Sequence, residues 1–228
     1  MPRLLGTPRL WLGVAGPALL LAAWGGASAA GWIPPYLLPP PGEIAAAAVG
    51  FVAGAGWQSP YAGRFWAHAS VSVGRVAAGF AVAAVAGVVL GVLSARWQRL
   101  GWFVDPVVQL VRAVPGISWL PLAMVWFGIG SPTAVFLIGL AAFFPVYINT
   151  LHGVRGIPEI WLRAAQTLGA RRTQLLWRVV LPGALPAIAA GLRVAMGVSW
   201  AYVVLGELTG VNCGLGAMIM DARMLGDV

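Results

Sequence analysis

Long stretches without a charged residue constrain the fold of this chain more than any other feature. Twenty consecutive uncharged residues separate Arg75 from Arg96, and another uncharged, largely apolar stretch covers residues 10–30. An α-helix needs about twenty predominantly apolar residues to cross the hydrocarbon core of a bilayer, which is about 30 Å thick. Only 9% of the 228 residues are charged, against roughly 25% in soluble domains. We therefore expect an all-α integral membrane protein.

The sequence predicts a polytopic helix bundle with about five spans. Their approximate ranges are 10–30, 76–95, 105–127, 133–151 and 183–205. Arginine is concentrated before the first span, after the second and after the fourth, and cytoplasmic loops carry such an excess of positive charge. We therefore expect the N-terminus and the loop after the fourth span to be cytoplasmic. A cleaved signal peptide is the alternative for residues 10–30, but about twenty apolar residues are long for such a peptide.

The two ends of the chain differ in organisation. Residues 1–66 are expected to hold the first span and a connector, because a run rich in proline follows that span. Residues 67–228 are expected to form the main helical core. Within the third span, Pro115 and Pro121 are expected to kink or break the helix. Arg112 of the same span is expected to extend its side chain toward the cytoplasmic end.

Small residues recur at every fourth position in two of the expected spans. They are Gly79, Ala83, Gly87, Gly91 and Ala95 in the second span, and Gly183, Ala187, Gly191, Ala195 and Ser199 in the fifth. This spacing places small side chains on one face of a helix and lets a neighbouring helix approach closely in a membrane. Both stripes are therefore expected to be packing faces.

The loop at residues 153–182 contains an amphipathic helix. Pro158 and Glu159 are typical of a helix start, and Gly169 is typical of a left-handed helix end, so we expect a helix over residues 158–168. A second helix is expected over residues 171–180, stopped by Pro182. The apolar face of the first helix therefore has to rest on the chain's own helix ends or on a partner. That face holds Ile160, Trp161, Ala164, Ala165 and Leu168, and the polar face holds Glu159, Arg163, Gln166 and Thr167.

The composition excludes several classes of function. All fourteen basic residues are arginine, and without lysine the chain has no P-loop for ATP. Cys213 is the single cysteine, and no metal site or set of serine, histidine and aspartate residues typical of an enzyme is visible. Most of the net charge of +8 lies between the spans, which favours a membrane protein over nucleic-acid binding. We expect neither enzyme activity nor a cofactor bound by this chain.

The loop also resembles a family motif. Ala164-Ala165, Gly169 and Leu181-Pro182 are spaced as in the cytoplasmic EAA loop of ABC importer permeases, the binding-protein-dependent transport family. The segments at residues 112–115 and 119–122 are similar to the nitrate, sulfonate and taurine branch. The resemblance implies an all-α membrane bundle of the type I ABC importer permease kind.

That resemblance implies a function and a set of partners. The chain would be the membrane-spanning subunit of an ATP-driven importer in the cell inner membrane, moving an aliphatic sulfonate, taurine or nitrate. Its partners would be a second permease copy, P-loop ATPase subunits that bind the ATP, and an extracytoplasmic substrate-binding protein. Two features depart from the family. Arg163 stands where the motif has glutamate, and a sixth span is expected to be missing after Asp227.

Two groups of candidate site residues follow. By the resemblance, contact with the ATPase belongs to the first loop helix and its turn, namely Glu159, Ile160, Arg163, Ala164, Ala165, Gln166, Leu168, Gly169 and Ala170. Arg193 lies about ten residues into the fifth span, and an arginine at that depth either attracts an anion or holds helices together. Ser199, Trp200 and Tyr202 are further candidates for the lining of a translocation path.

Two other classes of function remain as alternatives. A secondary transporter or channel would work without ATP, but it calls for ionisable residues near the membrane centre and an internal repeat with broken helices. No such repeat is visible in the sequence. A membrane scaffold that only binds a cytoplasmic partner is the third interpretation. Co-purification with a P-loop ATPase separates the importer from a transporter that works alone.

Overall fold

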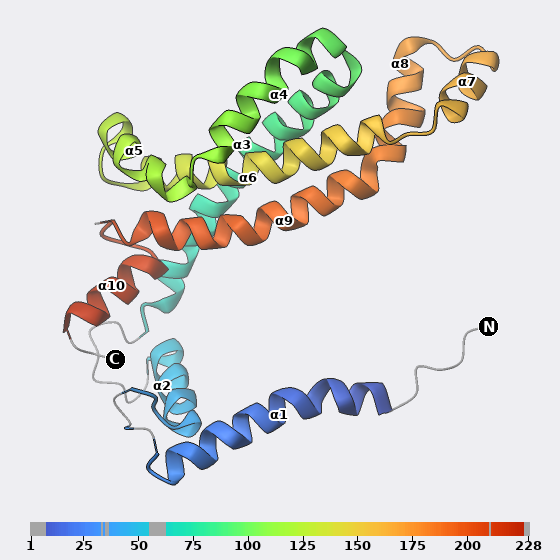
Figure 1. Ribbon diagram of the computed structural model, residues 1–228. Helices are drawn as coiled ribbons and strands as arrows, with labels where there is room; N and C mark the ends of the chain where they lie inside the picture. The colour runs from blue at the N-terminus through green and yellow to red at the C-terminus, as the bar shows by residue number, and fades with distance from the viewer. Residues whose placement is uncertain (1–7, 33, 35–36, 55–62, 210, 226–228) are drawn as a thin grey trace. The chain divides into compact units, whose positions relative to one another are not determined.

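A computed structural model of the chain describes residues 8–32, 34, 37–54, 63–209 and 211–225. All regular elements among these residues are helices (Figure 1), which confirms the all-α expectation. The chain divides into two compact units, one formed by residues 1–66 with 222–228 and the other by residues 67–221.

Among its described residues, the smaller unit contains two complete helices, which the proline-rich connector separates in the sequence. Helix α1, Pro8–Ala29, coincides with the first expected span, and its residues 13–29 are apolar. Helix α2, Pro41–Ala53, begins with a proline at a position where a missing N–H does no harm. It ends at Gly54, whose φ of 71° is left-handed. The last proline of the connector, Pro41, is therefore also the first residue of α2, where it does not interrupt the helix.

In the larger unit, α6 and α9 lie side by side along most of their length (Figure 1). The helices in chain order are α3 (Phe65–Arg96), α4 (Gln98–Ala113), the 3₁₀ helix η1 (Gly116–Trp119), α5 (Leu120–Phe127), α6 (Ser131–Arg155), α7 (Glu159–Thr167), α8 (Arg172–Leu175), the π-turn η2 (Leu176–Val180), α9 (Leu181–Glu207) and α10 (Leu215–Leu225). Among the described residues, three segments are long and apolar enough to cross a membrane: α3, α6 and residues 172–207. The bent pair formed by α4 with η1 and α5 makes a fourth if it counts as one span.

Both stripes of small residues pack against α6. A Cβ atom added to Gly79 of α3 would lie 2.7 Å from Ile138 Cγ2. A Cβ atom added to Gly191 of α9 would lie 2.8 Å from Asn149 Cβ. Both distances are too short for a real side chain, so glycine is what allows the helices to approach this closely. α6 is therefore the central helix, and the prediction that the stripes are packing faces is confirmed.

The third expected span is broken, and it starts earlier than predicted. α4 begins at Gln98 rather than at residue 105, and the axis turns by 91° between α4 and the η1–α5 segment. Val114 is extended, with φ −77° and ψ 122°, because the ring of Pro115 disfavours helical backbone in the residue before it. Pro121 breaks nothing, since it lies in the first turn of α5, where its missing N–H is not needed.

Pro182 does not stop the second loop helix, and this part of the sequence prediction is wrong. Residues 172–207 form one helical segment that runs from the loop into the bundle. Just before the proline, Leu181 N donates to Leu176 O, five residues back, so the segment passes through a π-turn. The wider turn displaces the carbonyls with which a proline ring collides in a regular α-helix. The loop therefore continues into α9 without a break.

Candidate functional site

The loop between α6 and α9 is organised around the turn at Gly169. This residue has φ 82°, the left-handed conformation predicted for the end of α7. Its N–H donates to Gln166 O at 2.9 Å, and the N–H of Ala170 donates to Ala165 O at 3.0 Å. This pair of bonds is a Schellman motif, which satisfies carbonyls of the last helical turn. The end of α7 is therefore held by its own backbone.

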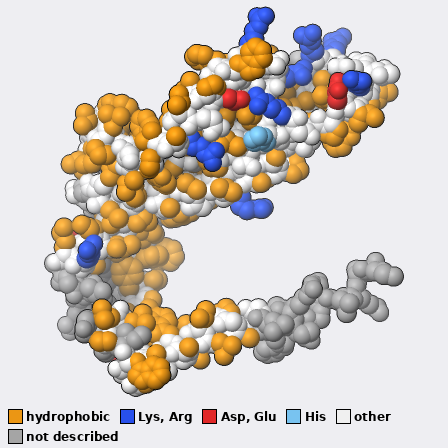
Figure 2. Space-filling model, viewed as in Figure 1, with side chains coloured by type: hydrophobic (Ala, Val, Ile, Leu, Met, Phe, Trp, Pro, Cys, Tyr) orange, Lys and Arg blue, Asp and Glu red, His pale blue; other side chains and the backbone are white. Residues whose placement is uncertain are grey.

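The apolar residues of α7 are largely uncovered by the chain itself. Ile160 is 71% exposed and Leu168 is 88% exposed. Leu162 is half-buried, and Trp161 lies close to Gly183 at the start of α9. Hydrophobic, arginine and acidic side chains appear together at this end of the unit (Figure 2). Ile160 and Leu168 therefore do not rest on the chain's own helix ends, and they are available to a partner.

The polar face of α7 carries one ion pair. Arg163 Nη2 lies 2.8 Å from Glu159 Oε1 one turn earlier, and the two side chains are 72% and 73% exposed. A surface pair of this kind adds little stability, but it holds the guanidinium group along the helix. Among the other candidates for ATPase contact, Ala164 and Gln166 are exposed, whereas Ala165 and Ala170 are half-buried.

The end of α6 next to this loop is tied to α4 through Asp105. Arg155, the last residue of α6, has its Nη2 atom 3.1 Å from Asp105 Oδ2. Tyr147, which is fully buried on α6, donates its hydroxyl hydrogen to Asp105 Oδ1. An ion pair and a hydrogen bond therefore connect α6 to α4 near the loop.

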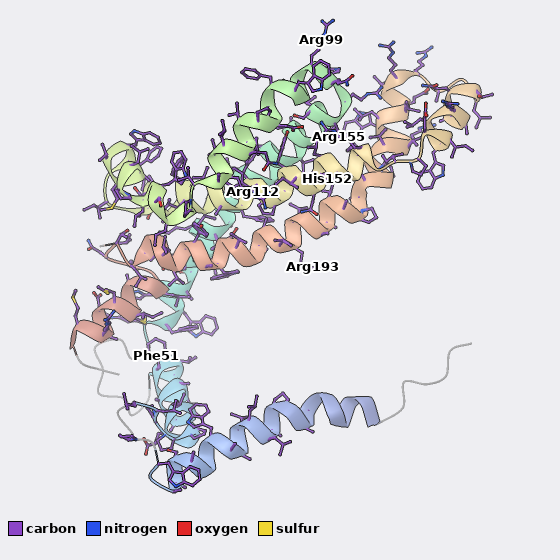
Figure 3. All side chains as sticks on the ribbon, viewed as in Figure 1. Phe51, Arg99, Arg112, His152, Arg155 and Arg193 are labelled. Carbon is purple, nitrogen blue, oxygen red and sulfur yellow. The ribbon has the colours of Figure 1, made fainter. Side chains whose placement is uncertain are left out.

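The four candidates for a translocation path lie in different surroundings on α9. Ser199 is fully buried and donates to Ala195 O of its own helix at 2.8 Å. Trp200 is 40% exposed. Arg193 is also exposed, and its side chain points away from α6 (Figure 3). Of the four, Tyr202 lines a cavity in the bundle beside the break in the third span.

That cavity has a volume of about 140 Å³. Arg112, Trp119 and Tyr202 contribute polar side chains to it, and its apolar wall consists of side chains from α6 and α9, including Leu140, Phe144 and Val198. Trp119 Nε1 is buried and has no hydrogen-bond partner among the described residues. Sequence reasoning missed the convergence of Arg112 with Trp119. The available signal was that both residues belong to the short segments similar to the nitrate, sulfonate and taurine branch.

Arg112 does not reach toward the end of the bundle that carries the loop, contrary to the sequence prediction. It lies fourteen residues after Gln98, the start of α4, which is about 21 Å along a helix that rises 1.5 Å per residue. A predicted start at residue 105 had placed it much nearer that end. The arginine instead occupies the last turn of α4, and Figure 3 shows it beside the middle part of α6.

A buried polar network at the opposite end of the bundle joins Arg75 to Glu207. Their side chains are 6% and 0% exposed, and Ser72 donates to both carboxylate oxygens of Glu207, at 2.7 and 2.9 Å. Arg75 also donates to Ser131 Oγ and to Cys213 O. Sequence reasoning used Arg75 only as the border of an uncharged stretch and missed its pairing with Glu207. The available signal was a serine and an arginine one turn apart on an otherwise apolar helix.

Known proteins similar to this chain are transport permeases. Residues 87–228 match the family described as binding-protein-dependent transport system inner membrane component. The taurine transport system permease protein TauC of Escherichia coli (strain K12) is 38% identical over 205 residues, which are 90% of this chain and 74% of TauC. SsuC of Bacillus subtilis (strain 168), named as an aliphatic sulfonates transport permease protein, is 35% identical over 207 residues, or 91% of this chain and 72% of SsuC.

A solved structure, the MetNI methionine ABC transporter in inward-facing conformations, has a similar fold. The TM-score is 0.62 at 21% identity, and the match covers 72% of this chain and 84% of that one. At this identity the likeness concerns the fold alone, and it confirms the expected fold class. The names of the relatives agree with the expectation that the chain is not an enzyme. From the family match and the identity over most of its length, the chain belongs to the inner-membrane components of binding-protein-dependent transport systems, the permeases of ABC importers.

Proposed function

We propose that this chain couples ATP hydrolysis by a partner ATPase to the import of a small sulfonate-type anion. The observation that carries the proposal is the exposure of α7, where Ile160 and Leu168 present apolar side chains at one end of the bundle. Exposed apolar surface on an ordered element is typical of an interaction site. The partner binds the ATP, because this chain has no lysine with which to form a P-loop.

The connections of the loop support a mechanical role for α7. Its end is fixed by the turn at Gly169, and η2 continues directly into α9. On the other side, Arg155 at the end of α6 pairs with Asp105 of α4. A force applied to α7 therefore acts on α4, α6 and α9 together. Rigid-body movement of packed helices is a general way in which a transporter alternates access between the two sides of a membrane.

In the proposed complex, α7 and the N-terminus face the cytoplasm of the cell. Five arginines of the loop region support this orientation, because positive residues favour the cytoplasmic side: Arg155, Arg163, Arg171, Arg172 and Arg178. Two copies of the chain pair with two P-loop ATPase subunits and receive solute from an extracytoplasmic binding protein. Exposed apolar side chains of α9, such as Leu185 and Val194, offer surface to a second copy or to lipid.

The relatives suggest the class of solute. TauC and SsuC are named for taurine and for aliphatic sulfonates, and these solutes share a sulfonate group. We extend that chemistry to this chain, with nitrate as the competing small oxyanion.

The test is ATP-dependent uptake by the reconstituted complex. Proteoliposomes containing this chain, its ATPase and its binding protein are expected to accumulate radiolabelled taurine or an alkanesulfonate only when ATP is supplied. Uptake driven by an ion gradient without ATP would identify a secondary transporter and overturn the proposal. An assembled complex that takes up neither sulfonate nor nitrate would support a membrane scaffold instead.

A pair of isoleucine variants tests the docking surface. Ile160→Asp is expected to abolish co-purification of the ATPase, because it places a charge in the exposed apolar surface of α7. The matched control is Ile129→Asp, which changes an isoleucine of similar exposure, 66%, in the turn before α6 at the other end of the bundle. Retention of the ATPase by Ile160→Asp would contradict docking at α7.

A further inference from the structure

We infer that the cavity at the α4–η1 break binds the oxyanion group of the solute during its passage through the membrane. The inference rests on the proposed import function and assigns three side chains within it, those of Arg112, Trp119 and Tyr202. They come from three different elements, α4, η1 and α9, and meet at a space of about 140 Å³.

All three side chains are hydrogen-bond donors. Arg112 carries five N–H groups, the indole N–H of Trp119 can only donate, and Tyr202 offers a hydroxyl hydrogen. Trp119 Nε1 is buried without a partner in the part of the chain that the structure describes. A buried donor without an acceptor is costly, and native proteins leave few of them. The indole N–H therefore lacks an acceptor among the described residues.

The charge at the cavity selects an anion as that acceptor. Arg112 is the one charged residue among those that line it, so the lining itself does not neutralise its charge. Its position in the last turn of α4 also suits the negative end of a helix dipole. The dipole does not account for the unpaired N–H of Trp119 or for the convergence of Tyr202 on the same space. An oxyanion in the cavity offers acceptor atoms to the donor side chains that line it.

The size and wall of the cavity suit a small organic sulfonate. A cavity of about 150 Å³ holds one molecule of benzene, and the volume here is similar. Leu140, Phe144 and Val198 supply apolar contacts for the short carbon chain of taurine or an alkanesulfonate. Nitrate could accept hydrogen bonds from the donor side chains, but it has no carbon chain to contact the apolar wall.

The broken backbone places the cavity at a position typical of a solute site. Non-helical backbone at membrane depth persists only where it is buried in protein or lines a water-filled cavity, and broken helices form the solute sites of many transporters. Here the break brings Gly116 against Tyr202, because a Cβ atom at this glycine would lie 2.6 Å from Tyr202 Cζ. Gly116→Ala is therefore expected to displace the tyrosine ring and reduce taurine uptake.

The test compares taurine uptake with ATP hydrolysis in the reconstituted complex. Arg112→Gln is expected to lower uptake about tenfold, because it removes the charged donor. Trp119→Phe keeps an aromatic ring but loses the N–H, and a smaller decrease of about threefold is expected. Hydrolysis stimulated by the loaded binding protein should change less than about twofold, since α7 is unchanged in these variants. Arg99→Gln on the same helix and Trp126→Phe, an exposed tryptophan of α5, are the matched controls and should behave as wild type.

The outcomes are distinguishable. Normal uptake by both Arg112→Gln and Trp119→Phe would overturn the inference and leave the proposed function intact. A parallel loss of uptake, hydrolysis and assembly in Arg112→Gln and in Arg112→Lys, which keeps the charge, would show a structural role and would also overturn it. Absence of sulfonate uptake by the wild type would overturn the proposed function, and the inference with it.

A lipid phosphate has the same oxyanion chemistry, and a lipid assay distinguishes the two sources. If Arg112 binds a phospholipid, the purified Arg112→Gln complex should retain fewer phospholipid molecules while taurine uptake is unchanged. That result would overturn the inference. Equal phospholipid retention with reduced taurine uptake supports it.

Discussion

Arg75 Nη1 lies 2.7 Å from Glu207 Oε1, and the two side chains are 6% and 0% exposed. The carboxylate also accepts hydrogen bonds from Ser72 Oγ and, at 2.8 Å, from the N–H of Gly216. A buried ion pair is tolerated when additional hydrogen bonds use the remaining donors and acceptors, as they do here. The network therefore joins α3 and α9 to the start of α10.

Glu207→Gln is expected to destabilise the protein by about 3–5 kcal/mol, because it leaves the guanidinium of Arg75 buried without a counter-charge. Replacing both residues by methionine should cost less than the single change, since no unpaired charge remains. Thermal unfolding in detergent measures both free energies. Glu159→Gln, which removes the partner of the exposed Arg163, is the surface control and should have little effect. A double variant less stable than Glu207→Gln would contradict this account of the pair.

Gly169→Ala is expected to disturb the end of α7 without any steric clash. The position has φ 82°, and no heavy atom lies within 4 Å of an added Cβ atom. Left-handed backbone costs about 1–2 kcal/mol in a residue with a side chain. Stimulation of ATP hydrolysis by the loaded binding protein should fall, while insertion and assembly persist. Gly197→Ala, with similar open space and no positive φ, is the control. Normal stimulation in Gly169→Ala would contradict the role of the turn.

Gly79→Val is expected to force α3 away from α6. An added Cβ atom would lie 2.7 Å from Ile138 Cγ2 and 2.9 Å from Val135 O, and the backbone oxygen cannot move aside as a side chain can. Overpacking of this kind costs about 1–3 kcal/mol, which thermal unfolding in detergent detects. Gly74→Val on the same helix meets no atom within 4 Å and should be tolerated. Equal stability of the two variants would contradict the packing of α3 on α6.

Asp105→Asn is expected to loosen the connection between α4 and the loop end of α6. Arg155 is 44% exposed in its side chain, so the loss of global stability should be small. Because the amide has no charge to pair with Arg155, the connection between α6 and α4 is weaker. We therefore expect less solute to be imported per ATP hydrolysed. Asp221→Asn on α10 is the matched control. An unchanged ratio of uptake to hydrolysis in Asp105→Asn would show that this ion pair plays no part in coupling.

Local patterns in the sequence predicted much of the fold. The uncharged stretch after Arg75 predicted α3. Small residues at every fourth position, among them Gly79 in α3 and Gly191 in α9, predicted the faces that pack against α6. Gly169 gave the left-handed end of α7. In each case the physical cause lies within a few residues of the feature, so sequence alone is enough to predict it.

The features that were missed depend on residues far apart in the chain. Arg75 and Glu207 are separated by 132 positions, and nothing local indicates that they meet. Trp119 and Tyr202 converge only because the chain turns by 91° after α4. The prediction that Pro182 ends the second loop helix was wrong, since the π-turn just before it lets the helix continue past the proline.

The central claim is that α7 contacts the ATPase, and site-directed cross-linking tests it most directly. A variant with Cys213→Ser removes the one native thiol, and Leu168→Cys then places a new thiol at the exposed apolar residue that directly follows α7. With a short bifunctional maleimide and an ATPase that carries cysteines in its docking groove, we expect a covalent product of this chain and the ATPase. Ile129→Cys in the same background should give none. A product from Ile129→Cys and none from Leu168→Cys would contradict the claim.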